Sequence, residues 1–334
     1  MNLYIKFVLI AITFPYHFPS SQYSKEAMSP TISIMNNVQN NITLKKTRYE
    51  SLMKMVPTVT NRVLEVIVDN ANTALVNAIR RTLMSEMPIR HLTVALTDIK
   101  STDPYIISES IRKRIEMIPI SQSTDMNAMF SLKYENDTNT YVDVMSTDIK
   151  LNGVSKTDDI TPMIPICDIN SKKSISISDI QVTESCGYDN SRSTIGRVAY
   201  EILDCDFSIA SINSNPTKFR LELEMAGVMN PLDILKKSIH NLIDRINYID
   251  FDNSITEFGI FKLTILNETY SVGQLMSYYI YKEEPSINYV ANRIKHPSIR
   301  ECIIDVHHPA GKSLCEKATK SVVKDLQSLL KSIK

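Results

Sequence analysis

The side chains best suited to bind a metal ion lie near the C-terminus, at Cys302, His307, His308 and Cys315. Thiolate and imidazole groups are the usual ligands of zinc in proteins. His307 and His308 end a predicted strand, in which successive side chains point to opposite faces, so their imidazoles do not converge. The 5 cysteines of the chain are widely spaced and include no C-x-x-C pair. We therefore predict core thiols in a reducing compartment and no metal site.

Several aspartates in predicted loops could in principle hold Mg²⁺ or transfer protons: Asp103, Asp158, Asp159, Asp204 and Asp206. None of them lies in a recognisable catalytic frame, and loop aspartates commonly bond their own backbone in turns. No nucleophile with an adjacent base is identifiable in the sequence, which argues against a stand-alone hydrolase. We predict no catalytic residues and no cofactor.

Composition places the chain among ordinary globular proteins. It has 334 residues, of which 43% are hydrophobic and 22% charged, and its formal net charge is zero. Whole-chain attraction to nucleic acid is therefore not expected, and contact would need a local basic patch. Arg112, Lys113 and Arg114 form such a run, but Glu109 and Glu116 flank it. We interpret this run as a protein interface or a solvated helix face.

The N-terminus permits two interpretations. An apolar run, Phe7–Phe14, follows Lys6 and is similar to a short signal-peptide core, but it is too short to span a bilayer. Three N-x-[ST] sequons lie at Asn41, Asn136 and Asn267. Together these features favour one alternative function, a secreted or lumenal glycoprotein with a binding role.

The other interpretation of residues 1–58 is an extension that precedes the working start of the protein, at Met28 or Met35. The polar stretch Ser20–Asn41 then reads as a disordered arm. We predict that 1–58 is such an extension and that no membrane is involved.

The elements that follow repeat one plan. Residues 62–100 and 258–297 each contain an extended apolar run, a capped helix that ends at a proline, and another extended run. In the first unit Asn72 or Thr73 caps the helix, and Pro88 ends it. Its buried face is predicted to comprise Leu75, Ala78, Ile79, Leu83 and Met87. In the second unit Ser271 is the candidate cap, Pro285 ends the helix, and the buried stripe is Val272, Leu275, Met276 and Tyr279.

Each unit is followed by a long helix with an apolar seam. The first starts at Pro231, and the second follows Pro309–Gly311. Apolar residues recur at alternating spacings of three and four, which is typical of helix packing. The seams comprise Leu232, Leu235, Ile239, Leu242, Ile246 and Ile249 in the first helix, and Ala318, Val322, Leu326, Leu329 and Ile333 in the second.

These elements predict an α+β fold with two pairing units. We assign residues 59–120 and 216–252 to a first unit and 253–334 to a second, with 250–256 as the junction. Residues 121–215 have no counterpart in the second unit and contain short strand patterns such as 140–144 and 175–178. We predict an inserted, mostly β subdomain there, and a further strand at Leu92–Leu96.

Motifs along the first unit match a known family. The segment Asn77–Pro88 reads NAIRRTLMSEMP, and Glu109–Ile120 is led by an acid and ends in a hydrophobic residue, Ile and Pro. Val144–Lys150 and Ile164–Ile166 match parts of an inserted domain, and Leu223–Gly227 matches a closing strand. In this order the motifs resemble the large α-like subunit of cellular RNA polymerases.

The second unit resembles the small α-like partner of that subunit. Glu268–Leu275 reads ETYSVGQL at the position of the partner's D-H-T-L-G-N-L signature, and Tyr289–Pro297 matches a later stretch. The sequence departs from the family at Glu268, Thr269 and Tyr270, which replace Asp-His-Thr, and at Glu116, which replaces a glycine. Fusion of both subunits in one chain is typical of nucleocytoplasmic large DNA viruses.

The resemblance implies a non-catalytic assembly subunit, whose two units form an intramolecular pseudo-dimer. It implies docking of the second-largest polymerase subunit at Arg80 and Arg81, with Glu86 and Arg114 nearby, because planar guanidinium groups pair well with carboxylates. The implied partners are the two largest subunits and a small zinc-binding subunit, with DNA and RNA contacted only indirectly. The implied location is intracellular, in host cytoplasm and virion. The residues expected to pair the helices are Leu75, Ile79, Leu83, Leu235, Ile239, Leu242, Ile246, Leu275, Met276, Val322, Leu326 and Leu329.

Overall fold

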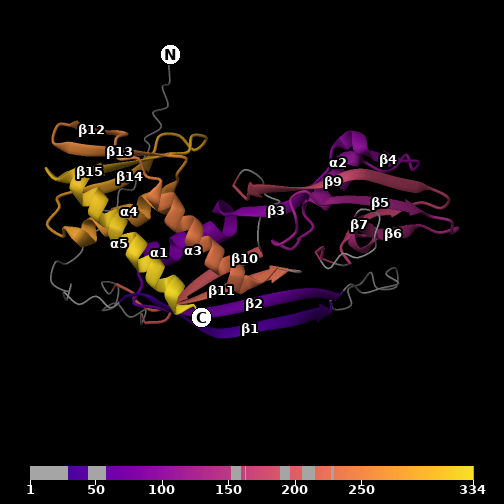
Figure 1. Cartoon of the computed structure of the whole chain (residues 1–334), viewed down its shortest axis with the longest axis horizontal. Coiled ribbons are helices and arrows are strands. Elements are labelled where there is room, and N and C mark those ends of the chain that lie inside the picture. Colours follow the sequence, from indigo (N-terminus) through magenta and orange to yellow (C-terminus); the bar gives the residue numbers. More distant parts are fainter. Residues whose placement is uncertain are drawn as a thin grey trace, which may run out of the picture.

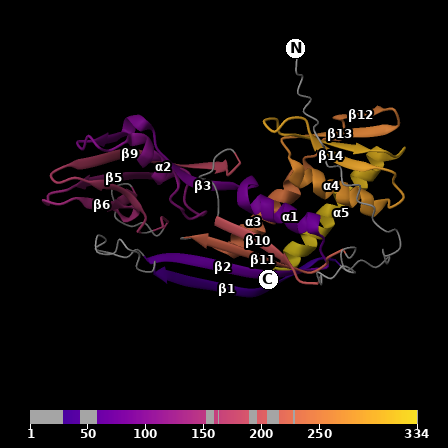
Figure 2. The same cartoon turned by 180° about the vertical axis from the view of Figure 1, so that it is seen from behind.

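The fold is that of a computed structural model, which describes residues 29–43, 58–151, 159–161, 163–188, 196–204, 215–226 and 229–333. The chain forms two lobes (Figure 1). One lobe holds the helices α1, α3, α4 and α5 between two sheets, and the other holds a separate set of strands with helix α2 (Figures 1 and 2). The class is α+β, as the sequence predicts, since all sheets are antiparallel and helices cover their faces.

The first sheet has the strand order β1-β2-β11-β10. Its strands are β1 (Thr31–Thr43), β2 (Thr58–Asp69), β10 (Gly196–Ile202) and β11 (Phe219–Ala226). Apolar residues alternate along β2 and β11, and Val66 lies opposite Leu221 in the register. Both side chains are fully buried. Alternation therefore places one face of this sheet against the helices.

Strand β1 corrects the prediction that Ser20–Asn41 is a disordered arm. It pairs with β2 along its whole length, from Thr31 opposite Asp69 to Thr43 opposite Thr58. Its Asn- and Ser-rich sequence has low strand propensity, so local pattern does not identify it. Backbone hydrogen bonds to β2 define it instead. Residues before 29 lie outside the described part of the chain.

The C-terminal end of α5 contacts the start of β1. The Ile32 amide donates to Ser332 Oγ at 2.8 Å, across a sequence separation of 300 residues. Ser332 is the last residue of α5 (Gly311–Ser332). The first strand and the last helix are therefore in direct contact.

The first pairing helix follows its predicted signals. α1 (Thr73–Arg81) begins at Asn72, whose Oδ1 accepts from the Leu75 amide at 2.8 Å. A π-helical turn, η1 (Thr82–Glu86), continues it. Met87 is extended, as expected for a residue before proline, so the helix ends ahead of Pro88. Helix α3 (Pro231–Asn247) begins where Pro231 predicts, with Asn230 as its cap.

The second half builds the sheet β12-β13-β15-β14 under α4 (Tyr270–Glu283) and α5. Its strands are β12 (Ser254–Glu257), β13 (Ile260–Leu266), β14 (Val290–Ile294) and β15 (Glu301–Val306). Phe258 and Gly259 form the turn between β12 and β13, both with positive φ. The predicted strand from Phe258 therefore starts only at Ile260, because this pair makes a two-residue hairpin turn.

Ser271 is not the cap of α4. The helix begins at Tyr270, and Thr269 precedes it without a capping hydrogen bond from its side chain. Ser271 lies inside the first turn and donates its hydroxyl to Glu86 Oε1 at 2.7 Å. Its polar atom is thus used between elements, and this use is invisible to a local capping rule.

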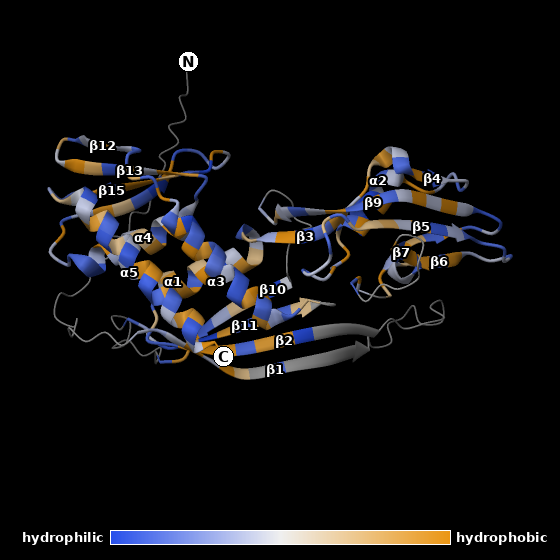
Figure 3. Cartoon of the chain, in the orientation of Figure 1, coloured by the Kyte–Doolittle hydropathy of each residue, from blue (hydrophilic) through white to orange (hydrophobic). Residues whose placement is uncertain are grey.

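One continuous apolar core joins both halves. It contains residues of α1, α3, α4 and α5 together with the inner faces of both sheets. Apolar positions alternate with polar ones along these helices (Figure 3). All the residues expected to pair the helices are buried in this core: Leu75, Ile79, Leu83, Leu235, Ile239, Leu242, Ile246, Leu275, Met276, Val322, Leu326 and Leu329.

The second lobe has its own core. Its larger sheet has the order β3-β9-β5-β7 with β4 also on β9, and β6 pairs with β8. Its elements are β3 (Pro88–Thr93), η2 (Leu96–Asp98), β4 (Ile99–Ser101), α2 (Ser108–Glu116), β5 (Met129–Glu135), β6 (Val142–Met145), η3 (Ser146–Asp148), β7 (Ile149–Leu151), β8 (Pro165–Ile169) and β9 (Ser174–Cys186). Most of these elements are strands, and β5 to β9 lie within the predicted insertion 121–215.

Both predicted boundaries of the insertion move. Residues 92–120, assigned to the first pairing unit, contribute Leu92, Ile111 and Ile115 to the core of the second lobe. At the other end, β10 belongs to the first sheet, so the insertion ends before Gly196 rather than at 215. Pairing of β3 with β9 and of β10 with β11 decides these limits, and such long-range pairing has no local signature. The predicted strand Leu92–Leu96 ends at Thr93.

No helix in the described residues is long and apolar enough to cross a membrane.

Gly273 of α4 provides a test of packing between α4 and the second sheet. A Cβ at this position would lie 2.3 Å from the Sγ of Cys302, which is fully buried on β15. We expect Gly273→Ala to lower the free energy of unfolding by about 1–3 kcal/mol, because overpacking strains the core. Urea denaturation measures this change. The double variant Gly273→Ala/Cys302→Ala should lose less than the sum of the single losses; simple additivity would contradict the proposed clash.

Candidate functional site

A buried guanidinium group joins three elements of the lobe that holds α1, α3, α4 and α5, which we call the pairing lobe. Arg245, near the end of α3, donates from Nη1 to Glu86 Oε2 of η1 at 2.9 Å. Its Nε donates to Glu268 Oε1 at 2.7 Å, and its Nη2 donates to the other oxygen of the same carboxylate. Glu268 lies two residues before α4. The bidentate pair on one side and the single contact on the other hold α3, η1 and the start of α4 together.

Hydroxyl groups complete the partners of this ion triad, which comprises Glu86, Arg245 and Glu268. Glu86 Oε1 accepts from Ser271 Oγ at 2.7 Å and from Thr269 Oγ1 at 3.2 Å. Arg245 Nη1 also donates to Thr82 Oγ1 at 3.2 Å. Buried charges are tolerated only when such hydrogen bonds compensate for lost water.

The electrostatics of the triad favour the charged forms. Burial acts to raise the pKa of Glu86, but the Arg245 charge, the hydrogen bonds from Ser271 and Arg245, and the Arg81 charge outweigh it, so the pKa lies below its ordinary value. Burial acts to lower the pKa of Arg245, and the two carboxylates reverse this effect and raise it. Glu86 and Arg245 are therefore both charged at neutral pH.

A second polar contact crosses the helices. Tyr279 of α4 is fully buried and donates its hydroxyl to Asp325 Oδ2 of α5 at 2.7 Å. Asn72, the cap of α1, donates to the Tyr279 hydroxyl at 3.4 Å. Lys282 Nζ lies 3.6 Å from Asp325 Oδ2. Burial, together with the Asp325 charge, raises the pKa of Tyr279, so the phenol stays protonated and keeps donating.

Arg80 and Arg81 lie on the outer side of α1, and both are half-buried. Arg80 donates from Nε to Asn77 Oδ1 at 3.0 Å, along its own helix. Arg81 has 38% of its side chain exposed, and its Nη2 is 3.8 Å from Glu86 Oε1. Glu86 itself is only 6% exposed and is occupied by internal partners. Glu86 is therefore part of the internal triad and not of the predicted docking surface.

Arg114 lies far from this region. It is an exposed residue of α2 in the second lobe, where its Nη1 donates to the Ile166 carbonyl at 2.9 Å (Figure 1). The neighbouring Arg112 pairs with Glu116 at 2.9 Å, with the Glu116 side chain fully buried. The structure thus brings Arg80, Arg81 and Glu86 together and separates Arg114 from them.

The candidate metal ligands form no site in the described part of the chain. No group of three or more His, Cys, Asp or Glu residues that could hold a metal ion occurs there. Burial raises the pKa values of Cys302 and Cys315 to about 12, which keeps both thiols protonated. Cys167 in the second lobe has a pKa of about 12 for the same reason. Protonated core thiols are poor ligands and poor nucleophiles. Cys205 lies outside the described residues.

Two of the candidate aspartates accept hydrogen bonds from backbone amides in turns. Asp103 accepts from the amides of Tyr105 at 3.1 Å and Asn170 at 2.9 Å. Asp204 accepts from the Thr217 amide at 2.7 Å. Asp158 and Asp206 lie outside the described residues. These contacts match the interpretation of loop aspartates as backbone-bonding turn residues.

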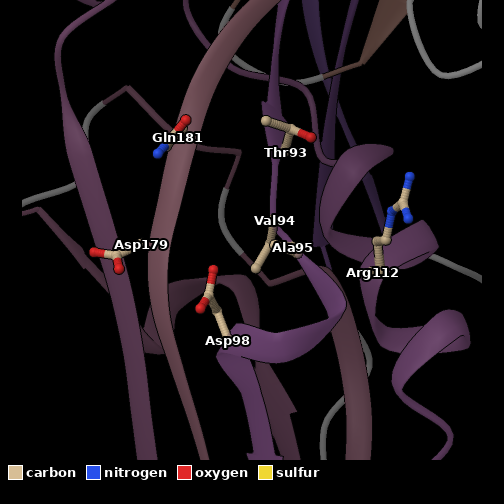
Figure 4. Close-up of a pocket in the computed structure, with 7 residues that line it drawn as sticks. All are labelled: Thr93, Val94, Ala95, Asp98, Arg112, Asp179 and Gln181. Carbon is tan, nitrogen blue, oxygen red and sulfur yellow. The ribbon is translucent and has the colours of Figure 1, made fainter.

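A shallow cavity of about 330 Å³ lies in the second lobe, lined by Thr93, Val94, Ala95, Asp98, Arg112, Asp179 and Gln181. Figure 4 shows Asp98 and Asp179 on one side and Arg112 on the other. Arg112 already donates to Glu116. The lining contains no Cys, His or Ser that could act as a nucleophile or base with them.

One sequon is inaccessible in the folded chain. Asn136 is 2% exposed, and its Nδ2 donates to the carbonyls of Thr140, Ile169 and Asn170. An amide nitrogen engaged in this way cannot carry a glycan. The alternative of a secreted or lumenal glycoprotein therefore loses one of its three sequons.

Sequence reasoning misses Arg245 and Glu268. The seam pattern treats Arg245 as an exposed residue beside Ile246, and a lone charge near a helix end is ordinarily solvated. Glu268 lies in the stretch that resembles the small α-like partner, where an acid replaces an acid. The retained acid could have indicated a buried carboxylate, but its partner Arg245 lies 23 residues upstream and is not marked by any local pattern.

The fold is an α+β fold in which four helices share one apolar core between two antiparallel sheets. The family model for the RNA polymerase Rpb3/Rpb11 dimerisation domain matches residues 65–246, more than half of the chain. The chain belongs to this family. The match runs from β2 to the end of α3 and includes Glu86 and Arg245.

Viral relatives extend the similarity into the second half. A protein named DNA-directed RNA polymerase RPB3-11 homolog, from a warthog isolate of African swine fever virus from Namibia, is 25% identical over 306 residues, covering 78% of this chain and 85% of the relative. The protein of the same name from a tick isolate of that virus from Malawi is 24% identical over 348 residues, covering 90% of this chain and 95% of the relative. The expected resemblance to fused α-like polymerase subunits is confirmed.

The ion triad predicts a large loss of stability when one member is removed. We expect Arg245→Ala to lower the free energy of unfolding by about 3–5 kcal/mol, because two buried carboxylates lose their counter-charge. Chemical denaturation measures the loss. Arg80→Ala serves as the control, and it should change stability by about 0.5 kcal/mol or less, since Arg80 is half-exposed. Equal losses for both variants would contradict a special role for the triad.

The lowered pKa of Glu86 predicts a pH dependence. Because its folded pKa lies below the ordinary value of 4.5, its ionised form contributes stability above that pH, and the contribution is lost as pH falls through the folded value. The free energy of unfolding should therefore decline between about pH 5 and pH 3. Glu86→Gln should flatten this decline, measured by urea denaturation across the range. An unchanged pH profile in the variant would show that other carboxylates cause the decline.

Proposed function

We propose that this chain is a non-catalytic assembly subunit of a multisubunit DNA-directed RNA polymerase, with two α-like units that pair within one chain. The observation that carries the proposal is the ion triad, because Glu86 and Arg245 come from the first unit and Glu268 from the second. The common apolar core of α1, α3, α4 and α5 supports the same pairing. Covalent fusion keeps the second unit at high effective concentration around the first, so pairing needs no separate association step.

The proposed partners are the two largest subunits of the polymerase and a small zinc-binding subunit. Docking of the second-largest subunit is assigned to Arg80 and Arg81. In support, both side chains lie on the outer side of α1 and retain exposed surface, while the buried side of the same helix joins the core. Arginine is enriched among residues that dominate binding energy at interfaces. Phosphodiester formation would belong to the largest subunits, and this chain would position them.

The named relatives support a viral setting. They are proteins of African swine fever virus whose printed name joins RPB3 and RPB11 in a single homolog. By this similarity we assign the chain to a viral transcription complex, in the cytoplasm of the infected cell and in the virion. Fractionation of infected cells and of purified virions tests this assignment.

Charge reversal at the docking residues tests the function. We expect Arg80→Glu/Arg81→Glu in a tagged chain to reduce recovery of the two largest polymerase subunits from infected cells by about tenfold or more, because two favourable charge contacts become repulsive. Quantitative mass spectrometry of the purified complex measures recovery. The matched control is Lys236→Glu/Lys237→Glu on α3, which makes the same change in net charge.

Two outcomes would contradict the proposal. If the unaltered tagged chain recovers no large polymerase subunit, the assembly function fails. If the Arg80/Arg81 variant recovers them as well as the control does, the docking surface lies elsewhere. Arg81→Glu also removes a charge that stabilises the buried Glu86 and is expected to lower the unfolding midpoint. The single variant Arg80→Glu leaves that charge in place and therefore separates a lost contact from a destabilised fold.

A further inference from the structure

The outer face of α5 carries a row of lysines. Lys317, Lys320, Lys324 and Lys331 are all exposed and follow one another at spacings of three, four and seven residues. Residues at these spacings lie on one side of an α-helix, so the four ammonium groups form a stripe about 21 Å long. We call these four residues the lysine stripe. Figure 3 shows the polar positions of α5 alternating with apolar ones that face the core.

The stripe is not neutralised by neighbouring acids within the described part of the chain. None of its four lysines forms an ion pair there, whereas Lys312 at the start of the helix pairs with Asp252. The acidic residues of α5 are Glu316 and Asp325, and Asp325 already accepts from Tyr279 and faces Lys282. Like charges at these spacings repel one another along the helix.

Two acidic side chains from the end of α4 lie beside the stripe. Glu283 of α4 accepts from Ser321, and Lys317 is among the charges that act on Glu284. In the described residues no carboxylate lies within ion-pair distance of a stripe lysine, so all four ammonium groups remain available to an anion.

The chemistry of this face does not match a protein interface. The large hydrophobic side chains that the structure exposes elsewhere include Tyr248 and Phe258, and none of them lies on α5. Protein interfaces rely on such aromatic and apolar anchors, and lysine is depleted in them. Sequence-independent contact with nucleic acid depends instead on ammonium groups beside phosphates. The stripe offers the ammonium groups that contact with nucleic acid requires and lacks the apolar anchors of a protein interface.

We propose that the lysine stripe of α5 binds the phosphate backbone of duplex DNA without reading its sequence. A duplex is favoured over a single strand because no exposed aromatic side chain on α5 offers a stacking platform for unpaired bases. The buried seam of Val322, Leu326 and Leu329 fixes the rotation of the helix, so the stripe is held outward. This contact goes beyond the assembly function, and it differs from the expectation that DNA is contacted only indirectly.

Salt-dependent binding of the full chain to DNA tests the proposal. The probe is a fluorescently labelled duplex of mixed sequence, and anisotropy gives the association constant at several salt concentrations. Four phosphate contacts predict a slope of log K against log salt of about −3.6, or about a hundredfold loss between about 50 and 200 mM salt. Lys320→Glu/Lys324→Glu should weaken binding at low salt by tenfold or more and lower the slope to about −1.8. Lys236→Glu/Lys237→Glu on α3 makes the same change in net charge and should stay within about twofold of the unaltered chain.

Several outcomes would overturn the proposal. Equal effects of the two variants would show that net charge, and not the stripe, governs binding. Tighter binding of single-stranded RNA than of duplex would contradict the duplex assignment, and tighter binding of polyglutamate of matched charge would indicate an acidic protein instead. Because the assay uses the purified chain alone, its result is independent of whether polymerase subunits dock at Arg80 and Arg81. Circular dichroism of the variants keeps a folding defect distinct from a lost contact.

Discussion

The buried guanidinium of Arg245 is the constraint around which the pairing lobe is organised. It satisfies two carboxylates at once, and each of the three groups is costly to bury without the other two. α3, η1 and the segment that leads into α4 must therefore adopt one relative arrangement, because a shift of any of them would leave a buried charge unpaired. The apolar seams bury the hydrophobic surface of the helices, but such surfaces tolerate repacking. The ion triad adds polar contacts of fixed geometry to helix surfaces that are otherwise apolar.

The division of labour between apolar and polar contacts also explains the difference between the two lobes. The pairing lobe uses long helices whose seams meet across both halves, with Tyr279 and the triad as polar fixed points. The second lobe is built on strands around a core of its own, and its polar side chains serve turns. A lobe with an independent core can vary in its surface without disturbing the pairing of the helices. The two lobes are thus built on separate cores.

Much of the pairing lobe could be predicted because its signals are local. The cap at Asn72, the stop at Pro88 and the seam of α3 are periodic or positional patterns within a few residues. The missed features all depend on distant partners. β1 is a strand only because β2 lies beside it, and Ser271 and Arg245 find their partners on other elements. The net charge of zero gives no sign of the lysine stripe, which becomes recognisable once the structure shows four exposed lysines on one side of α5 and Asp325 bonded to Tyr279.

The hydrogen bond between Ile32 and Ser332 has a consequence for the order of events during synthesis. β1 is synthesised well before α5, so the start of β1 lacks this contact until α5 has been made. Contacts of such large sequence separation form slowly, because the chain must close a long loop before any contact compensates for it. In two separate subunits that final step would depend on their concentrations. Within one chain the two elements are tethered, so the rate at which β1 and α5 meet does not depend on protein concentration.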